Sequence, residues 1–268
     1  MSHFQNKVVV VTGGSEGIGL ALVEKLLDEG ALVSTCSRKF DKLYSLQLKY
    51  TGSPLHTMTC DVSKPADCEQ FIAATLKTFG RIDILINNAG ISMRAEFKDA
   101  SVTVLQQLMD VNFWGAVYCT KLALPSLLEN KGTVVGISSI AGYRGLPGRS
   151  GYSASKHALQ GWLEALRTEL MDSGVHVMWI SPGFTASNIR NTALDASGNA
   201  QGESPLEESA LMTASECAAE ILKAVAKKKR TLVLSSNGKQ TVFLNRLSPS
   251  LADKLVHRFF YKNGRLIK

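Results

Sequence analysis

Apolar runs and amphipathic stretches alternate along most of the chain. Val8–Val11 are four consecutive valines, a run typical of a strand that is buried on both faces of a parallel sheet. A glycine-rich turn follows, and then an amphipathic stretch from about Ile18 to Asp28 predicts a helix that ends before Gly30. The same alternation predicts strands over 31–35, 56–59, 82–86, 132–137 and 175–180, and helices over 41–49, 65–79, 103–128 and 152–171. Strands that alternate with helices indicate an α/β fold, a doubly wound parallel sheet with helices on both faces.

The last third of the chain departs from this alternation. The segment 191–209 is rich in Gly, Ser, Ala and Glu and has weak periodicity, so we expect a substrate loop or lid over about 188–215. A short strand is expected at Leu232–Leu234, and apolar side chains then recur at helical spacing from Leu247 to Phe260 among cations. This spacing predicts a basic amphipathic C-terminal extension over about 240–268. No repeat or linker marks a second unit, so residues 1–268 are expected to form a single domain.

A glycine-rich turn joins the first predicted strand to the first predicted helix. It reads Thr12-Gly13-Gly14-Ser15-Glu16-Gly17-Ile18-Gly19. Glycines let the backbone approach a pyrophosphate closely, and the helix that follows offers N–H donors and the positive end of its dipole. We therefore expect a dinucleotide site that includes Gly13, Ser15, Glu16, Gly17, Ile18 and Gly19.

The end of the second predicted strand bears on which dinucleotide binds. NAD sites of this type place an acid about 20 positions beyond the glycines, where it binds the ribose 2′-hydroxyl. Here the chain reads Thr35-Cys36-Ser37-Arg38-Lys39, without a carboxylate. Ser37 can hydrogen-bond a 2′-phosphate and Arg38 can pair with it, which favours NADP(H). An exposed loop arginine is the alternative, and the acidic Glu16 is a mild signal in the other direction.

Tyr152 and Lys156 are four positions apart at the start of a predicted helix. They therefore lie on one face of that helix. A free tyrosine titrates at about pH 10, and a cation held beside the phenol stabilises the phenolate and lowers that pKa. Tyr152 can then exchange a proton with a carbonyl or hydroxyl oxygen as a general acid/base. The spacing alone occurs by chance in many helices, so the assignment depends on the neighbouring motifs.

These motifs, in this order, resemble those of the short-chain dehydrogenase/reductase family, whose fold is of the Rossmann type. The resemblance spans roughly residues 7–187 and also includes Asn87-Asn88-Ala89-Gly90, Ser138-Ser139 and Pro182-Gly183. It implies that Ser139, thirteen residues before Tyr152, orients the substrate oxygen, while Ser138 makes only a strand-end hydrogen bond. It further implies that Lys156 also binds the nicotinamide ribose, and that Asn112 supports a proton relay.

The resemblance also assigns further cofactor contacts. The residues that it places there are Asp61, Val62, Asn88, Ala89, Gly90, Tyr152, Lys156, Pro182, Gly183 and Ser187. Asp61 could instead cap a helix near Ser63. Within the family, the segment 142–149 and the basic tail resemble the subgroup related to 11-beta-hydroxysteroid dehydrogenase.

The motifs together predict an NADP(H)-dependent oxidoreductase that transfers a hydride between nicotinamide and an alcohol/carbonyl substrate. The expected pocket walls mix apolar side chains with cations, which suits a hydrophobic or lipid-like substrate, or one with an acidic group. These walls are Ser92, Met93, Arg94, Tyr143, Arg144, Leu146, Phe184 and the lid after Ile189. Each arginine could instead lie at the surface. The alternative is an NADP-binding regulatory or scaffold protein that keeps the fold without the chemistry. No metal is expected.

Charge is unevenly distributed along the chain. The net charge is +7, but residues 223–268 hold 12 Lys and Arg and a single acid, Asp253. The remainder carries a slight excess of acid, which argues against nucleic-acid binding. The basic tail either packs on the body or a neighbouring subunit, or contacts an anionic membrane surface.

Cysteine usage and the N-terminus bear on location. Five scattered cysteines form no C-x-x-C pair, and neither a signal peptide nor an apolar stretch of spanning length is evident. We therefore expect a cytoplasmic protein with reduced thiols, with association at a membrane surface as the alternative. The family resemblance implies a homodimer or homotetramer, formed through the helices that contain Asn112 and Tyr152.

Overall fold

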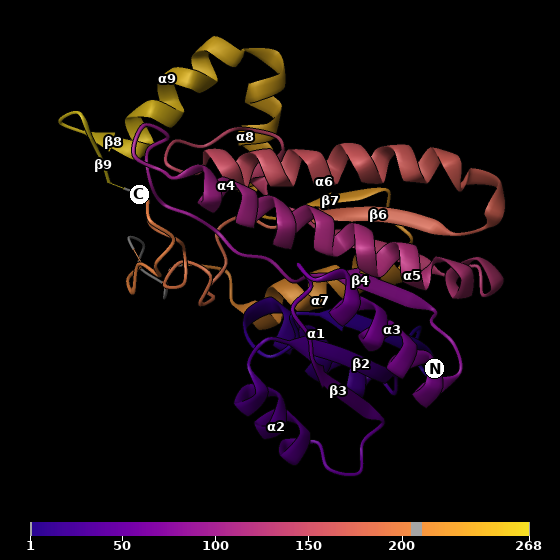
Figure 1. Ribbon diagram of the computed structural model, residues 1–268. Coiled ribbons are helices and arrows are strands. Elements are labelled where there is room, and N and C mark those ends of the chain that lie inside the picture. The colour runs from indigo at the N-terminus through magenta and orange to yellow at the C-terminus, as the bar shows by residue number, and fades with distance from the viewer. Residues whose placement is uncertain (1, 205–210, 268) are drawn as a thin grey trace.

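Seven parallel strands form the centre of the protein. The structure is a computed structural model that describes residues 2–204 and 211–267. The strands lie in the order β3-β2-β1-β4-β5-β6-β7, and helices cover both faces (Figure 1). Their bounds are β1 (Val8–Thr12), β2 (Leu32–Ser37), β3 (Leu55–Thr59), β4 (Ile84–Asn87), β5 (Thr133–Ile137), β6 (His176–Ser181) and β7 (Thr231–Val233). The predicted doubly wound α/β fold is confirmed.

The helices divide between the two faces of this sheet. α1 and α7 pack together on one face, while α3 packs on α5 and α4 packs on α6 on the other. The helical bounds are α1 (Gly17–Asp28), α2 (Phe40–Lys49), α3 (Pro65–Phe79), α4 (Val102–Met109), α5 (Gly115–Glu129), α6 (Ser150–Glu169), α7 (Ala214–Ala226), α8 (Ser236–Leu247) and α9 (Pro249–Phe260). No helix in the ranges 2–204 and 211–267 is both long and apolar enough to span a bilayer.

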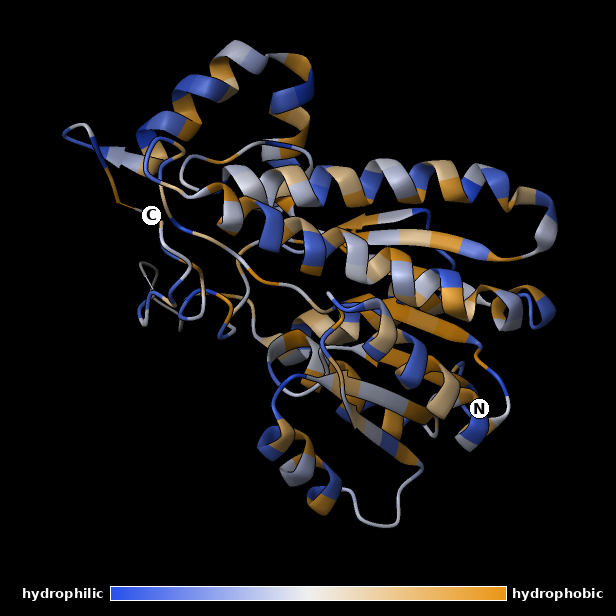
Figure 2. Cartoon of the chain, in the orientation of Figure 1, coloured by the Kyte–Doolittle hydropathy of each residue, from blue (hydrophilic) through white to orange (hydrophobic). Residues whose placement is uncertain are grey.

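The four valines of β1 show why the central strands lack polar positions. Val10 belongs to the core cluster that contains Phe71 of α3, while Val9 and Val11 belong to the cluster on the other face, with Leu22 of α1. Successive side chains of a strand point to opposite faces, so a strand covered on both faces needs an apolar residue at every position. Figure 2 shows the resulting hydrophobic colour along the central strands.

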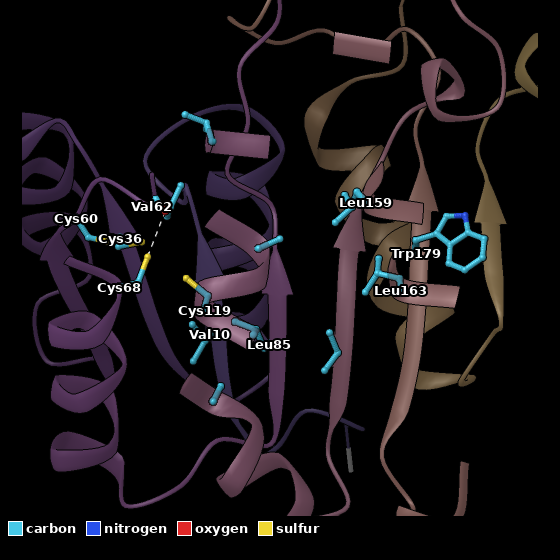
Figure 3. Packing of buried hydrophobic residues seen from close by; sticks show 14 of the residues in the cluster. Val10, Cys36, Cys60, Val62, Cys68, Leu85, Cys119, Leu159, Leu163 and Trp179 are labelled. Carbon is cyan, nitrogen blue, oxygen red and sulfur yellow. Dashed lines mark hydrogen bonds between the residues drawn. The ribbon is translucent and has the colours of Figure 1, made fainter. Parts of the chain in front are cut away.

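Four cysteines lie in one of the two cores (Figure 3). Cys36, Cys60, Cys68 and Cys119 are buried and free, and the Cys68 thiol donates a 3.3 Å hydrogen bond to the carbonyl oxygen of Val62. The contacts with Cys36 and Cys68 and the burial of its side chain raise the pKa of Cys60. The four thiols therefore pack as small, largely apolar side chains of the core.

The helix predicted over 103–128 is divided in the structure. α4 ends at Met109, the π-helical turn η1 spans Asp110–Trp114, and α5 follows. Apolar periodicity continues across the junction, so it could not reveal the extra residue that a π turn inserts. Such turns are frequent at functional sites, and η1 contains Asn112.

Two helices near the C-terminus differ from expectation. α7 was not among the predicted helices, although Thr213 and Glu216 form a capping box at its start, with Glu216 also bonded to the Thr213 backbone N–H. The apolar spacing from Leu247 to Phe260 was read as one helix, but α8 ends at Leu247 and α9 begins at Pro249. Proline at a first helical position fits because it needs no N–H partner there. Residues 205–210 of the predicted lid lie outside the described residues.

The C-terminal extension packs on the body near the start of α6 (Figure 1). Asn245 of α8 donates a 3.0 Å hydrogen bond to the Tyr143 carbonyl oxygen, and Arg144 pairs with Asp253 of α9. After α9 the chain forms the two-stranded hairpin β8 (Tyr261–Lys262) and β9 (Arg265–Leu266). The extension also keeps an exposed apolar row: Phe243, Leu247, Leu251, Leu255 and Phe259.

Candidate active site

One continuous cavity lies at the carboxyl ends of β1, β2, β4, β5 and β6. β3 and β4 flank the pair β2-β1 on opposite sides, so the chain reverses its direction across the sheet at β1 and β4. Ligands of open α/β sheets bind at such a switch point. Every residue predicted to contact the cofactor lines this cavity: Gly13, Ser15, Glu16, Gly17, Ile18, Gly19, Ser37, Arg38, Asp61, Val62, Asn88, Ala89, Gly90, Tyr152, Lys156, Pro182, Gly183 and Ser187.

The glycine-rich turn needs its glycines for steric reasons. Gly13 has a φ of +71°, and a Cβ there would lie 2.9 Å from the Cα of Ala89. A Cβ on Gly19 would lie 2.2 Å from the carbonyl oxygen of Gly13. Helix α1 therefore starts directly against the turn, with its first residues on the cavity wall. This is a cradle that a side chain would fill, and its helix N-terminus suits an anion such as a pyrophosphate.

Thr12 joins the turn to the loop after β4. Its Oγ1 accepts hydrogen bonds from the backbone N–H groups of Asn88 and Ala89, both at 3.0 Å. The Asn88 side chain returns two bonds, from Nδ2 to the carbonyl oxygens of Thr12 at 2.9 Å and Gly13 at 3.2 Å. Asn88 thus holds the two halves of the cavity floor together, in addition to lining it.

The far end of the cavity is lined by Ser37 and the exposed Arg38. Ser15 donates a 2.7 Å hydrogen bond from Oγ to the Oγ of Ser37. Sequence reasoning missed the partner of Glu16, which is Lys42 on α2. Burial opposes ionisation of Glu16, but Lys42 outweighs it and lowers the Glu16 pKa. Glu16 is therefore ionised and its charge is balanced by a cation.

The structure separates the two interpretations of Asp61 that the sequence left open. It lines the cavity, and its Oδ1 also accepts hydrogen bonds from the backbone N–H of Ser63 at 3.1 Å and the Ser63 hydroxyl at 2.8 Å. Helix α3 itself is preceded by Lys64. Asp61 therefore shapes the turn before α3 and does not cap the helix.

Tyr152 and Lys156 share one face of α6. The Lys156 ammonium lies 5.7 Å from the centroid of the Tyr152 ring and donates a 2.9 Å hydrogen bond to the carbonyl oxygen of Ile137. Lys156 is buried, and the loss of hydration lowers its pKa to about 8. At neutral pH it is still mostly a cation, held where it can stabilise a phenolate.

The two serines at the end of β5 have different surroundings. Ser139 lines the cavity, and its Oγ accepts a 3.1 Å hydrogen bond from the backbone N–H of Ala141. Ser138 is buried and accepts a 2.8 Å bond from Nε2 of Gln160. Burial raises the pKa of Tyr152, while the Ser139 hydroxyl and the Arg149 guanidinium act to lower it. Both serines line the cavity, and of the two it is Ser139 that acts on the Tyr152 pKa. The assignment of the substrate oxygen to Ser139 stays a prediction.

Asn112 lies behind the cavity wall. Its side chain accepts a 2.8 Å hydrogen bond from the backbone N–H of Ile91 and donates to the Ile91 carbonyl oxygen at 3.0 Å. Nδ2 also donates to Oγ of Ser155 at 2.9 Å, which joins the loop after β4 to α6. The π turn brings Asn112 to this position, so it acts on the site by holding two elements together.

The predicted substrate walls are borne out in part. Ser92, Leu146 and Phe184 line the cavity. The other four face different partners: Met93 is buried in the core, Arg94 pairs with Glu203, Tyr143 accepts a 2.9 Å hydrogen bond from the Trp179 indole, and Arg144 pairs with Asp253. Arg190 and Thr192 of the predicted lid also line the cavity, and Arg149 and Thr185 line it but were not identified from sequence. Arg149 could have been found from its position, because a residue three places before Tyr152 lies close to the predicted catalytic tyrosine.

Comparison with solved structures supports the same architecture. A short-chain dehydrogenase/reductase from Burkholderia phymatum in complex with NAD superposes with a TM-score of 0.83 at 23% identity, covering 94% of this chain and 96% of that one. An alcohol dehydrogenase from Thermococcus sibiricus, complexed with 5-hydroxy-NADP, gives a TM-score of 0.75 at 24% identity and covers 86% of this chain and 96% of that chain. At these identities the likeness concerns the fold.

Sequence relatives identify the family. Residues 7–197 match the family model described as short chain dehydrogenase. Dehydrogenase/reductase SDR family member 7B of Mus musculus is 36% identical over 93% of this chain and 80% of the mouse protein. Dehydrogenase/reductase SDR family protein 7-like of Anopheles gambiae is 34% identical over 93% of this chain and 81% of the mosquito protein. The chain therefore belongs to the short-chain dehydrogenase/reductase family.

Proposed function

We propose that this oxidoreductase transfers a hydride between NADP(H) and an alcohol/carbonyl substrate. One observation carries the proposal: Ser139, Tyr152 and Lys156 line the same cavity as the glycine-rich turn. A dinucleotide laid on that turn would extend toward Tyr152, because the cavity is continuous between the two. When bound, the cofactor supplies or accepts the hydride at the substrate carbon.

The chain's own residues handle the substrate oxygen and its proton. Ser139 holds the oxygen, and Tyr152 donates its phenolic proton to it in the reductive direction or accepts a proton in the oxidative direction. The Lys156 cation stabilises the phenolate left on Tyr152 and would bind the nicotinamide ribose hydroxyls. Asn112 fixes the loop at Ile91 and the helix at Ser155, which keeps the relay near Lys156 in place.

The preference for NADP(H) rests on charge at the far end of the cavity. Arg38 and Ser37 line it where an NAD site would place an acid. Lys42 neutralises Glu16, so the single acid of the glycine-rich turn does not repel a 2′-phosphate. The test is Arg38→Asp with titration of both cofactors, in which NADPH affinity should fall at least about tenfold and NADH affinity should change little. An unchanged ratio of the two affinities would overturn the preference.

The enzymatic activity is tested on a broad panel of ketones and aldehydes with NADPH. Oxidation of reduced nicotinamide, followed by its absorbance, is the expected result. Tight NADPH binding without turnover on any member of the panel would favour the rival, a regulatory or scaffold protein that retains the fold.

Aromatic residues on the outer faces of η1, α5 and α6 suggest how subunits assemble. Trp114 is exposed and stacks on Tyr118 at 5.9 Å between ring centroids, and Phe113 lies edge-on to Trp162 at 6.2 Å. We propose that this face forms the contact of a homodimer or homotetramer. Trp114→Glu should lower the mass measured by light scattering, and an unchanged mass would contradict the proposal.

The exposed apolar row of the C-terminal extension suits contact with an anionic membrane surface. α8 and α9 carry this row, Phe243, Leu247, Leu251, Leu255 and Phe259, together with the cations Lys239, Arg246, Lys254 and Arg258. Co-sedimentation with phosphatidylserine vesicles should be lost in Leu251→Ser/Leu255→Ser. Equal sedimentation of the variant would refute the contact, and the cytoplasmic location itself stays a prediction.

A further inference from the structure

Arg149 is a buried cation in the wall of the active-site cavity. It precedes α6, three residues before Tyr152, and lines the cavity together with Ser139 and Tyr152. The residue is only 7% exposed. Its Nη1 donates a 3.1 Å hydrogen bond to Oγ of Ser92, while its Nε has no hydrogen-bond partner among residues 2–204 and 211–267. A buried N–H group without a partner is rare and costly in a folded protein.

No carboxylate in the described part of the chain forms an ion pair with Arg149. The neighbouring arginines differ in this respect. Arg94 pairs with Glu203, and Arg144 pairs with Asp253. Buried charges in proteins are normally paired, so a guanidinium that lines a cavity and has no acid among the described residues is suited to bind an anionic ligand.

The positive charges around Arg149 further favour an anionic partner for its guanidinium. Burial lowers the Arg149 pKa, and the nearby Arg94 and Arg190 lower it further, against the opposing effect of Tyr152. Arg190 lines the same cavity and donates a 2.8 Å hydrogen bond from Nη2 to the carbonyl oxygen of Thr185. An arginine keeps its charge at neutral pH even so. This end of the cavity is therefore positive and draws anions.

We propose that Arg149 binds an anionic group, a carboxylate or a phosphate, on the same molecule whose carbonyl or hydroxyl group reacts at Tyr152. The inference rests on the proposed function and narrows its substrate class. Nη1 is engaged by Ser92 and Nε is enclosed by protein atoms. The guanidinium lines the cavity, so its charge and its cavity-facing edge can bind an oxygen of a carboxylate or phosphate. A substrate without an anionic group would leave this buried charge without a partner.

Arg149 also affects Tyr152 electrostatically, and the two effects are separable. Its influence on the Tyr152 phenol does not depend on the charge of the substrate. Anion binding does depend on it, so matched acids and esters with the same carbonyl distinguish the two. The pairs are phenylglyoxylate and levulinate, each against its methyl ester, with dihydroxyacetone phosphate against dihydroxyacetone as the phosphate arm.

Binding is measured on protein saturated with NADP⁺, which cannot reduce the carbonyl, so that the result does not depend on turnover. At least one of the anions should bind more tightly than its neutral partner, by about 10- to 100-fold for a charge-assisted pair. Arg149→Met should remove this difference. Arg144→Met is the matched control, because Arg144 pairs with Asp253, does not line the cavity and is not among the groups that shift the Arg149 pKa, and it should keep the difference.

Two results would overturn the inference: equal binding of every anion and its neutral partner by the native protein, or a difference that survives in Arg149→Met. Melting temperatures of the variants show whether the fold is intact. If Arg149→Met does not fold, Arg149→Lys replaces it and should weaken the preference because a lysine has no fork of donors. Reduction of neutral ketones without any anion preference would refute the inference alone. Anion binding without reduction of any carbonyl compound would instead refute the proposed function alone.

Discussion

The ammonium group of Lys42 on α2 pairs with the carboxylate of Glu16 beside the glycine-rich turn. Removing the cation should expose an NADPH phosphate to an unbalanced acid. Lys42→Met should therefore weaken NADPH binding about two- to fivefold, the range of a partly exposed ion pair, and NADH binding less. Fluorescence titration of both cofactors measures it.

The control for this prediction is Lys49→Met. Lys49 pairs with Glu24 at 2.6 Å on the same pair of helices, but it does not line the cofactor cavity. Its loss should leave both affinities unchanged. Equal losses for NADPH and NADH in Lys42→Met would mean that the Lys42–Glu16 pair only supports the fold.

Tyr152 should be separable from cofactor binding. Tyr152→Phe keeps the ring that packs against the core but removes the hydroxyl. We expect carbonyl reduction to fall by at least about 100-fold, the usual contribution of a general acid, with NADPH affinity within about threefold because the other contacts remain. Steady-state kinetics with a titration of NADPH fluorescence would check both. Turnover at the native rate would remove Tyr152 from the chemistry.

The pH dependence should follow Lys156. Burial lowers its pKa to about 8, so the ammonium is retained below that value and lost as the pH rises through it. The phenolate that forms on Tyr152 then loses its stabilising charge. At saturating NADPH, the rate of carbonyl reduction should be constant near neutral pH and fall above about pH 8. At about pH 9, one unit above the Lys156 pKa, about a tenth of the Lys156 side chains are still charged.

A rate that stays flat well above pH 8 would show that this cation is not needed or titrates higher once the cofactor is bound. Melting temperatures across the same range separate loss of activity from loss of fold. The NADPH affinity at each pH separates chemistry from binding.

Asn112 should contribute to stability as well as activity. Asn112→Leu leaves the backbone N–H and carbonyl groups of Ile91 without their partner in a buried position. We expect the free energy of unfolding to fall by about 2–4 kcal/mol, measured by urea denaturation. Asn237→Ala on α8 is the control, since its side chain is exposed, and should change stability by less than about 0.5 kcal/mol. A similar loss in both variants would contradict the role of Asn112.

Sequence patterns predicted the sheet and the cofactor cavity better than the substrate end. Val8–Val11 and the glycine-rich turn are local signals, because burial on both faces and a close backbone approach each require particular residue types. The partners of Arg94 and Arg144 could not be predicted. Both cations were read as pocket walls, yet Glu203 and Asp253, more than 100 residues away in the chain, engage them.

The same limit applies to the helices. The helical spacing of apolar residues continues through η1 at Asp110–Trp114 and through the Ser248–Pro249 junction. The apolar positions on each side of both breaks keep the same spacing, so the spacing does not reveal the breaks. Pro249 is a sequence signal for a new helix start, and Thr213 with Glu216 is a capping-box signal for the start of α7. The π turn had no such marker, so the exact placement of Asn112 needed the structure.

The Thr12 hydroxyl accepts hydrogen bonds from the backbone N–H groups of Asn88 and Ala89, across the switch point of the sheet. This means that the floor of the crevice is already assembled before a cofactor arrives. Little chain entropy then has to be lost on binding, and most of the contact free energy can appear as affinity. We therefore expect the cofactor to bind to a preformed site with little conformational change. Slower conformational changes should be confined to the substrate end of the cavity.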